Sequence, residues 1–498
     1  MRHMSANLFS SVFVPRSTFY DSPFGRIFNH LAPWVPEGAT DQERAANLGV
    51  FARDEMFEPT GAGSEFDNAN LPAGYTYLGQ FIDHDITFDP TSSLMRANDP
   101  NRLRNFRTPR LDLDSVYGKG PNASPYLYDA DRSSPSGDGF TGFFLIGKGA
   151  SGQEDDLPRN SRGTALIGEP RNDENIIVSQ IQLSILKLHN RVLDNIVGDP
   201  NQGATQEQFQ EAQRIVRWFY QYIVWNDFVK RIVADTVFNE VLQKEAGVYV
   251  LKNRFYDWKQ APYIPVEFSV AAYRFGHSLV RPGYQINIRL GVGVEKPIFD
   301  PLNPGAEDDL HGGRPLPENH TLQWDWFLQF PSSGGPFPQN TRQIDTKLSS
   351  SVFRIPTDGF GGNNPLAFLN LVRGWRMELP AGPAVAKAMG VRPLDVAGNQ
   401  QALWYYILKE AETLPDGKAG QMLGPVGGRI VAEVFAGLLK GDPLSYVNCD
   451  PNWTPAQEPH LPFNVPDDNR DDWEFADLIK AAGMPIDGND INQLLGTP

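Results

Sequence analysis

Residues 79–85, Gly-Gln-Phe-Ile-Asp-His-Asp, combine a histidine, two carboxylates and an amide within two helical turns. Gln80 and His84 are four positions apart, so a helix places them on the same face. Asp83 and Asp85 lie about 100° to either side of His84. Such a segment can present to a cavity an imidazole that moves protons, with an amide beside it. A solvated acidic turn has the same composition, so both interpretations stay open for this segment alone.

Residues 108–118 contain a second group of oxygen ligands. Asp112 and Asp114 alternate with leucines, so in an extended loop both carboxylates point the same way. With the hydroxyl and carbonyl of Thr108 and the carbonyl of Arg110 they form an oxygen-rich cup, which calcium prefers. The 12-residue spacing of an EF-hand is absent. An exposed acidic turn is the alternative interpretation.

Three further segments contain polar residues that could take part in binding or catalysis. Arg171 and Glu174 stand at the predicted start of a long helix, where the helix dipole favours Glu174. Arg171 can serve there as an anion clamp or as an ion-pair partner. His277 lies in an apolar run beside Gly276, which leaves room for a bulky group, although a lone histidine there is more often packed in the core. Asn370 interrupts another apolar run and needs a partner if it is buried.

Apolar residues spaced three, four and seven apart predict the helices that must position these side chains. We expect helices over residues 74–88, 174–197, 206–230, 232–246, 265–279, 364–376, 382–389, 400–413 and 427–440, with short ones near 470–483 and 488–495. Residues 96–165 and 296–345 are rich in loop-forming residues. The predicted fold class is one large, mainly α domain with long connecting loops and little β. Its parts are a loop-rich lead-in of residues 1–70, a core of residues 71–445 and a C-terminal extension of residues 446–498 packed on the core.

Composition excludes several classes of function. The chain of 498 residues has 44 Lys and Arg against 60 Asp and Glu, a net charge of −16, which disfavours nucleic acid and anionic membranes as partners. Its one cysteine, Cys449, rules out an intrachain disulfide and a multi-cysteine metal site. No apolar run reaches the ~20 residues that span a bilayer, and residues 8–14 make a poor signal peptide. We therefore expect a soluble protein, either cytoplasmic or secreted by a route without a leader.

Taken together and in order, from about residue 70 to 376, these five segments resemble the peroxidase–cyclooxygenase superfamily, and in particular the animal-type haem peroxidases. Residues 21–34 and 188–191 extend the resemblance. The chain is compact beside the mammalian enzymes and lacks their disulfides, which is typical of a bacterial member. The resemblance implies a haem peroxidase that reduces hydrogen peroxide through a ferryl intermediate. Its expected donors are bromide, iodide, thiocyanate or phenols.

The resemblance also assigns roles around the haem. His84 matches the residue that moves the peroxide proton, Arg171 the one that polarises the O–O bond, and Gln80 the one that holds water or halide over the iron. His277 matches the iron ligand, and Asn370 matches the acceptor of its other ring proton. Two arginines, Arg274 and Arg373, match the family's arginines near the haem propionates.

Covalent haem and calcium are further implications of the resemblance. Asp83 and Glu174 match the carboxylates that form ester links to haem b. The residues that match calcium ligands are Asp85, Thr108, Arg110, Asp112 and Asp114. Asp114 replaces a serine of the mammalian enzymes and adds negative charge to the site. Asn175 stands where some members have a methionine that forms a sulfonium link, and this departure argues against efficient chloride oxidation.

Two alternatives remain. A fatty-acid dioxygenase of the same fold needs a tyrosine three residues before the iron ligand; Arg274 occupies that position, and Tyr273 is displaced by about 100° on a helix. A non-catalytic interaction module that has lost haem is the other alternative. Retention of His84, Arg171 and His277, with Asn370, argues against it.

Overall fold

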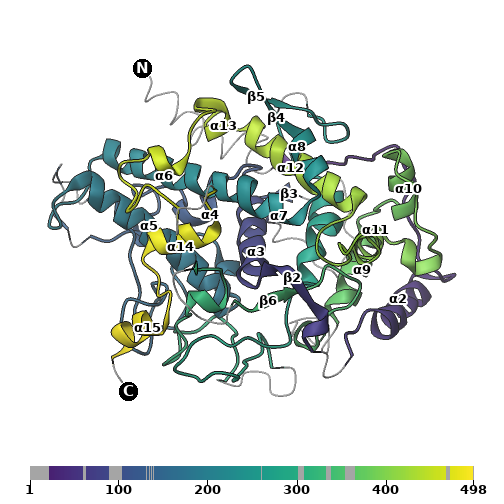
Figure 1. The fold of residues 1–498 in the computed structure, drawn as a ribbon, viewed down its shortest axis with the longest axis horizontal. Helices are drawn as coiled ribbons and strands as arrows, with labels where there is room; N and C mark the ends of the chain where they lie inside the picture. The colour runs from purple at the N-terminus through teal and green to yellow at the C-terminus, as the bar shows by residue number, and fades with distance from the viewer. Residues whose placement is uncertain are drawn as a thin grey trace.

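The structure is a computed structural model in which helices dominate (Figure 1). It describes residues 22–59, 63–88, 104–130, 132–133, 135, 137, 140–258, 261–300, 308–331, 338–353, 365–466 and 472–496. The strands in these ranges form two-stranded antiparallel pairs: β1 (Ser22–Pro23) with β3 (Arg104–Asn105), β2 (Asp67–Pro72) with β6 (Asn340–Arg342), and β4 (Leu242–Glu245) with β5 (Val248–Leu251). The prediction of a mainly α fold with little β is confirmed. Asp21 and the residues before it lie outside the described ranges.

The helix that carries His84 lies at the centre of the molecule (Figure 1). This helix, α3 (Gly74–Ile86), is buried along most of its length and packs against α5 (Ile176–Val197). In turn, α5 packs against α6 (Gln206–Ile223). The side chain of Asn175 accepts a hydrogen bond from the Val178 amide and caps α5, so this helix begins after Glu174. The cap therefore leaves Glu174 just outside the helix.

A second group of elements holds His277 and Asn370. Asn370 lies on α9 (Leu366–Arg376), while His277 ends a short irregular segment that packs against α11 (Leu403–Glu412) and α12 (Pro425–Gly441). The predicted single helix over residues 265–279 is wrong. The chain forms a π-helical turn, η7 (Glu267–Ala271), and then a 3₁₀ segment, η8 (Ala272–His277), with Ala271 far from helical angles at φ −127°, ψ −73°. The buried Glu267 carboxylate binds the backbone of Phe28 at 2.9 Å and ties the π turn to the lead-in.

Two other expectations need correction. The lead-in contains α2 (Asp41–Glu55), whose start is marked by a capping box between Thr40 and Glu43 rather than by apolar periodicity. The helix predicted over residues 232–246 ends early, at α8 (Asp235–Val241), because a β-hairpin follows it. Ala246 and Gly247 both have positive φ, 48° and 83°, which suits the tight turn of such a hairpin.

The remaining elements complete the body around this centre. Besides short 3₁₀ turns, they are α4 (Asp114–Tyr117), the π-helical η6 (Val224–Val229), α7 (Lys230–Ile232), α10 (Gly382–Ala388), α13 (Tyr446–Cys449), α14 (Phe475–Ala482) and α15 (Gly488–Leu495). Near the C-terminus, α14 packs against α5, so this part of the chain belongs to the same folded unit as the central helices. No helix among the described residues is long and apolar enough to cross a bilayer.

Candidate functional site

One cavity of about 810 Å³ collects half of the residues that the sequence marked for chemistry. Its size lies within the roughly 300–1,000 Å³ of typical ligand and cofactor sites. The predicted residues that line it are Gln80, Asp83, His84, Arg171, Glu174, Arg274 and His277. They come from the central helix α3, from the turn before α5 and from η8. Folding therefore brings together segments nearly 200 positions apart in the chain.

His84 is held in one tautomer by a neighbour that sequence reasoning missed. Its Nδ1 lies 2.8 Å from Asn172 Oδ1, and Asn172 Nδ2 donates to Gln182 Oε1 over 2.8 Å. Because an amide oxygen only accepts, Nδ1 carries the proton and Nε2 is left with a free electron pair. Burial, and then the charge of Arg171, lower the pKa of His84 to about 3. The imidazole is therefore neutral at physiological pH and suited to act as a base.

Arg171 is fixed by a carboxylate two residues earlier. Its Nε and a terminal nitrogen donate to Glu169 over 3.0 and 2.9 Å, and that terminal nitrogen also donates to the carbonyl of His84 over 3.2 Å. Burial alone would raise the pKa of Glu169, but hydrogen bonds and charge from Arg171 and Arg107 hold it at about 2. The guanidinium of Arg171 thus lies beside the cavity in a set orientation.

A carboxyl group and an amide meet inside the same cavity. Gln80 Nε2 donates to Glu174 Oε2 over 3.0 Å, and Asn175 Nδ2 donates to Gln80 Oε1 over 3.1 Å. Burial raises the pKa of Glu174 to about 7, against the opposing charge of Arg171. Asp83 also lines the cavity and accepts a hydrogen bond from Thr87 Oγ1 at 3.1 Å. Two carboxyl groups from different elements therefore reach one space.

His277 and Asn370 are in contact, as the sequence predicted for a partnered buried asparagine. His277 Nδ1 lies 2.7 Å from Asn370 Nδ2, and a half-turn of the amide about its last torsion brings Oδ1 to that position. Burial first, and Arg274 next, lower the pKa of His277 to about 3. A methyl group added at Gly276 would meet nothing within 4 Å, so open space adjoins the histidine.

The two predicted propionate arginines are placed differently. Arg274 lines the cavity, and its Nε donates to the carbonyl of Ser269 over 3.0 Å. Arg373 lies three positions after Asn370 on α9 and is not among the described residues that line the cavity.

Three carboxylates form an acidic cluster behind the central helix: Asp85, Asp112 and Asp114 each offer an oxygen within 4.8 Å of the others. The expected extended loop is wrong, because Leu113 adopts a left-handed conformation at φ 56° and Asp114 begins α4. This turn, rather than strand-like alternation, makes the carboxylates converge. Burial and the nearby charge of Asp112 raise the pKa of Asp85 to about 7. Carboxylates this close repel one another, so the cluster suits a divalent cation.

Thr108 and Arg110 lie beside this cluster. Thr108 Oγ1 donates to Asp112 Oδ1 over 2.9 Å, and the Arg110 amide donates to the Thr108 carbonyl over 2.8 Å. Ser115, which sequence reasoning did not single out, donates to Asp85 Oδ1 over 2.7 Å. The hydroxyls of Thr108 and Ser115 therefore lie at the acidic cluster.

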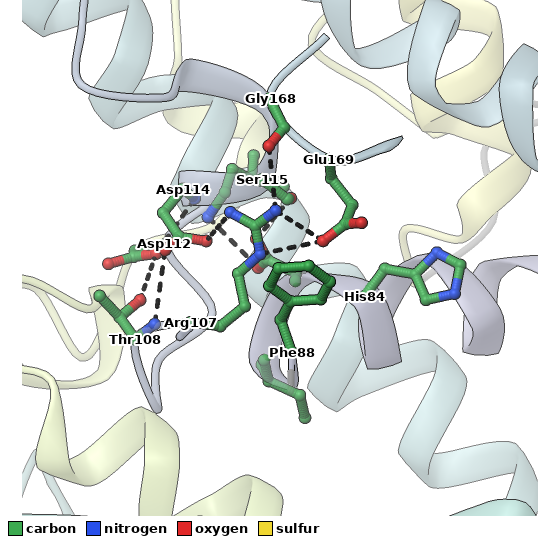
Figure 2. Close-up of polar contacts among 12 residues, drawn as sticks. His84, Phe88, Arg107, Thr108, Asp112, Asp114, Ser115, Gly168 and Glu169 are labelled. Carbon is green, nitrogen blue, oxygen red and sulfur yellow. Dashed lines mark hydrogen bonds and ion pairs between the residues drawn. The ribbon is translucent and has the colours of Figure 1, made fainter. Parts of the chain in front are cut away.

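Arg107 is a third residue that sequence reasoning missed. Figure 2 shows its guanidinium between Asp114 and Glu169, with the ring of Phe88 beside it and His84 directed away from the acidic cluster. Its Nε donates to Glu169 Oε2 over 3.1 Å, and a terminal nitrogen lies 3.4 Å from Asp114 Oδ1. No periodicity marks this loop arginine, because tertiary packing alone buries it.

The lining of the cavity also includes a loop that the sequence presented only as irregular. His311 and Asp309 both line it, and His311 Nδ1 contacts Asp309 Oδ1. Phe299 and Ile298, from the same loop, add apolar surface to the lining. A small aromatic molecule or an anion entering the cavity would meet these side chains.

Comparison with known proteins connects this chain to one family. Residues 93–291 match the family described as animal haem peroxidase. The chorion peroxidase of Drosophila melanogaster is 25% identical over 388 residues, which make up 70% of this chain and 44% of that protein. The chain spans less than half the length of the curated relatives it matches.

Solved structures share the fold. Peroxidase A from Dictyostelium discoideum superposes with a TM-score of 0.62 at 15% identity, covering 94% of both chains. A fatty acid alpha-dioxygenase from Arabidopsis thaliana superposes with a TM-score of 0.56 at 14% identity, covering 95% of this chain and 77% of that one. At these identities the likeness establishes a common architecture, and the chemistry must be argued from the site.

Proposed function

We propose that this chain, whose residues 93–291 match the animal haem peroxidase family, is a haem peroxidase that reduces hydrogen peroxide and oxidises small donors. The observation that carries the proposal is a pair of histidines on one cavity. His84 and His277 come from different elements, and an asparagine engages Nδ1 of each ring. In both rings Nε2 remains as the nitrogen available for chemistry.

The residues present fit a haem group. The cavity has a suitable volume, and open space adjoins His277 at Gly276. A neutral histidine whose Nδ1 is engaged by a neighbour is the usual ligand of haem iron. His277 would hold the iron, with Asn370 orienting the ring and Arg274 near the propionates; we place Arg373 near them also. When bound, haem supplies the redox chemistry of the peroxide reaction.

The chain's own residues then handle the proton and the developing charge. His84 Nε2 accepts the proton of bound hydrogen peroxide and returns it to the departing oxygen, so that water leaves. Arg171 stabilises the negative charge on that oxygen, since Glu169 holds its guanidinium beside the cavity. Gln80 orients a water molecule or a small anion. The neutral form of His84 supports its assignment as the base.

The proposed donors are bromide, iodide, thiocyanate and phenols. Arg171 and Arg274 offer local binding points for small anions among carboxyl groups that also line the cavity, whereas Phe299 and Ile298 offer a surface for phenols. Asn175 follows Glu174 directly and leaves no sulfur there for a third covalent link to haem. We therefore propose that chloride is a poor donor.

We further propose two ester links and one structural cation. Asp83 and Glu174 both reach the cavity and would bond to the edge of the haem. Asp85, Asp112 and Asp114 would bind calcium with oxygens of Thr108 and Arg110, and the closeness of three buried carboxylates supports this assignment. Because Asp85 and His84 are neighbours on α3, the cation would also steady the catalytic histidine.

A fatty-acid dioxygenase is the second candidate, and Tyr273 is the observation that favours it. Contrary to the expectation from its helical displacement, Tyr273 lines the cavity. Its hydroxyl donates to the Gly79 carbonyl over 3.1 Å, which ties it to the backbone of the central helix.

One experiment separates the two candidates. Haem-loaded protein is assayed for peroxide-dependent oxidation of iodide and of a phenol, and for oxygen uptake with palmitate. The proposal predicts the first activity and no oxygen uptake, in the wild type and in Tyr273→Phe alike. Oxygen uptake that Tyr273→Phe abolishes would establish the dioxygenase instead.

A further inference from the structure

A continuous chain of ionic contacts joins the acidic cluster to the cavity. Asp114 contacts Arg107 at 3.4 Å, and Arg107 Nε contacts Glu169 at 3.1 Å (Figure 2). Glu169 in turn contacts Arg171 at 2.9 Å. One atom, Glu169 Oε2, accepts hydrogen bonds from both arginines. The two guanidiniums therefore compete for the same carboxylate oxygen.

Both partners of the Arg107–Glu169 ion pair are buried or nearly so. The Glu169 side chain is 0% exposed and that of Arg107 is 10% exposed, so neither can exchange its partner for water. Asp114 and Glu169 supply the carboxylates that contact Arg107 and Arg171, while Asp85 and Asp112 add negative charge beside Asp114. The Phe88 ring packs near both guanidiniums, with centroid distances of 5.7 and 4.9 Å, and limits where they can move.

The Asp114 carboxylate takes part in two interactions. It pairs with Arg107, and it belongs to the acidic cluster that is proposed to bind a divalent cation. When a cation takes up the Asp114 charge, Arg107 depends on Glu169 alone. Glu169 then holds Arg171 less strongly, and more of the positive charge of Arg171 is left for an anion in the cavity.

We propose that Arg107 and Glu169 are positioning residues that couple binding of a divalent cation at Asp85, Asp112 and Asp114 to the hold on Arg171 in the cavity. The inference rests on the proposed function, because it needs both the cation and the haem. Coupling of this kind is reciprocal: an anion bound beside Arg171 tightens the cation site by the same factor. In this proposal Arg107 contacts neither the haem nor the peroxide, and it acts on Arg171 only through Glu169.

The test measures binding rather than turnover. Calcium binding to the haem-loaded protein is followed by calorimetry, and cyanide binding to the haem by absorption, with calcium present and with calcium removed by a chelator. The variants are Arg107→Gln, which removes the charge, and Arg107→Lys, which keeps the charge but loses the fork that reaches two carboxylates. Arg342→Gln is the matched control, since Arg342 is also buried and bridges two carboxylates, Glu58 and Asp67.

In the wild type, calcium is expected to tighten cyanide binding about fivefold or more. Arg107→Gln should bind calcium about tenfold more tightly, because a nearby positive charge is gone, yet calcium should no longer change its cyanide affinity. Arg107→Lys should bind calcium nearly as the wild type does and still lose most of the coupling. Arg342→Gln should keep both values.

Four results would overturn the inference. One is a cyanide response to calcium in Arg107→Gln that equals the wild-type response. Another is weaker calcium binding in Arg107→Gln, which would make Arg107 a merely structural support of the loop. If Arg107→Gln does not fold, full coupling in Arg107→Lys would contradict the bridging role. A wild type that binds neither calcium nor cyanide would reject the proposed function itself, and the coupling with it.

Discussion

Gln80 Nε2 donates a hydrogen bond to Glu174 Oε2 over 3.0 Å, although the two residues are 94 positions apart in the chain. The contact links the central helix α3 to the turn that precedes α5. It also holds a buried carboxyl group, whose pKa is raised to about 7, at the edge of the proposed haem cavity. Under the proposed function, this carboxyl group would be one of the two that hold the haem covalently.

Covalent haem is the first prediction. Peroxide-treated, haem-loaded protein should retain its haem in acid acetone, and peptides carrying Asp83 and Glu174 should gain the mass of haem. Asp83→Asn and Glu174→Gln should each lose one link, and the double variant should release all of its haem. Haem that is freely extractable from the treated wild type would refute the ester assignment.

The hydrogen bond from His84 to Asn172 gives the second prediction. Asn172→Leu removes the acceptor that fixes the His84 tautomer, so the rate of reaction with peroxide should fall by about tenfold or more. Asn172→Asp keeps an acceptor at this position and should retain more of the rate. Stopped-flow absorption measures both rates. Equal rates in Asn172→Leu and the wild type would mean that the tautomer is set elsewhere.

Cation removal is the third prediction. Because three buried carboxylates repel one another without a counter-ion, a chelator should lower the melting temperature by several degrees, and added calcium should restore it. Asp85→Asn should make the melting temperature independent of calcium. If neither chelator nor calcium changes the wild-type melting temperature, the proposed structural cation is refuted.

Glu410 provides a prediction about pH and stability. Burial raises its pKa from 4.5 to about 7, although its carboxylate caps α12 through the amides of Val426 and Gly427. A raised pKa means that the folded state holds the proton more tightly than the unfolded state. Its contribution to stability is therefore present at low pH and is lost as pH rises from about 4.5 to about 7.

Glu410→Gln should remove this loss. The free energy of unfolding of Glu410→Gln relative to the wild type should rise by about 1–3 kcal/mol between pH 5 and pH 8, measured by urea denaturation. Glu412→Gln is the control on the same helix, because hydrogen bonds from Lys409 and Thr346 lower the pKa of Glu412 despite its burial. Both its lowered pKa and the ordinary value of 4.5 lie below pH 5, so its relative stability should change little between pH 5 and pH 8. The same trend in both variants would contradict the raised pKa of Glu410 as the cause of the pH dependence.

Residues on regular helices could be placed from the sequence. The relative directions of Gln80, Asp83 and His84 follow from 3.6 residues per turn, and the structure directs Asp83 to the cavity and Asp85 to the acidic cluster. The expected start at residue 206 agrees with α6, whereas the expected start at residue 174 is two residues early, because Asn175 caps α5 and leaves Glu174 outside it.

The parts that could not be predicted depend on tertiary packing. Arg107 and Asn172 lie in irregular segments, where no period indicates which side chains become buried. The break at Ala271 lies in an apolar run that reads as a continuous helix, and the hairpin after α8 depends on an alanine with positive φ. At Arg107, Asn172 and Glu267, long-range contacts decide the local structure.

The central claim is that His277 holds a haem on which His84 directs the reaction with peroxide. The most direct measurement is the absorption spectrum of the haem-loaded protein before and after one equivalent of hydrogen peroxide, compared between the wild type and His84→Gln. The account predicts a Soret band in both proteins, with a rapid shift in the wild type and a shift at least about a hundredfold slower in His84→Gln. A folded wild type with no Soret band, or equally rapid shifts in the two proteins, would contradict it.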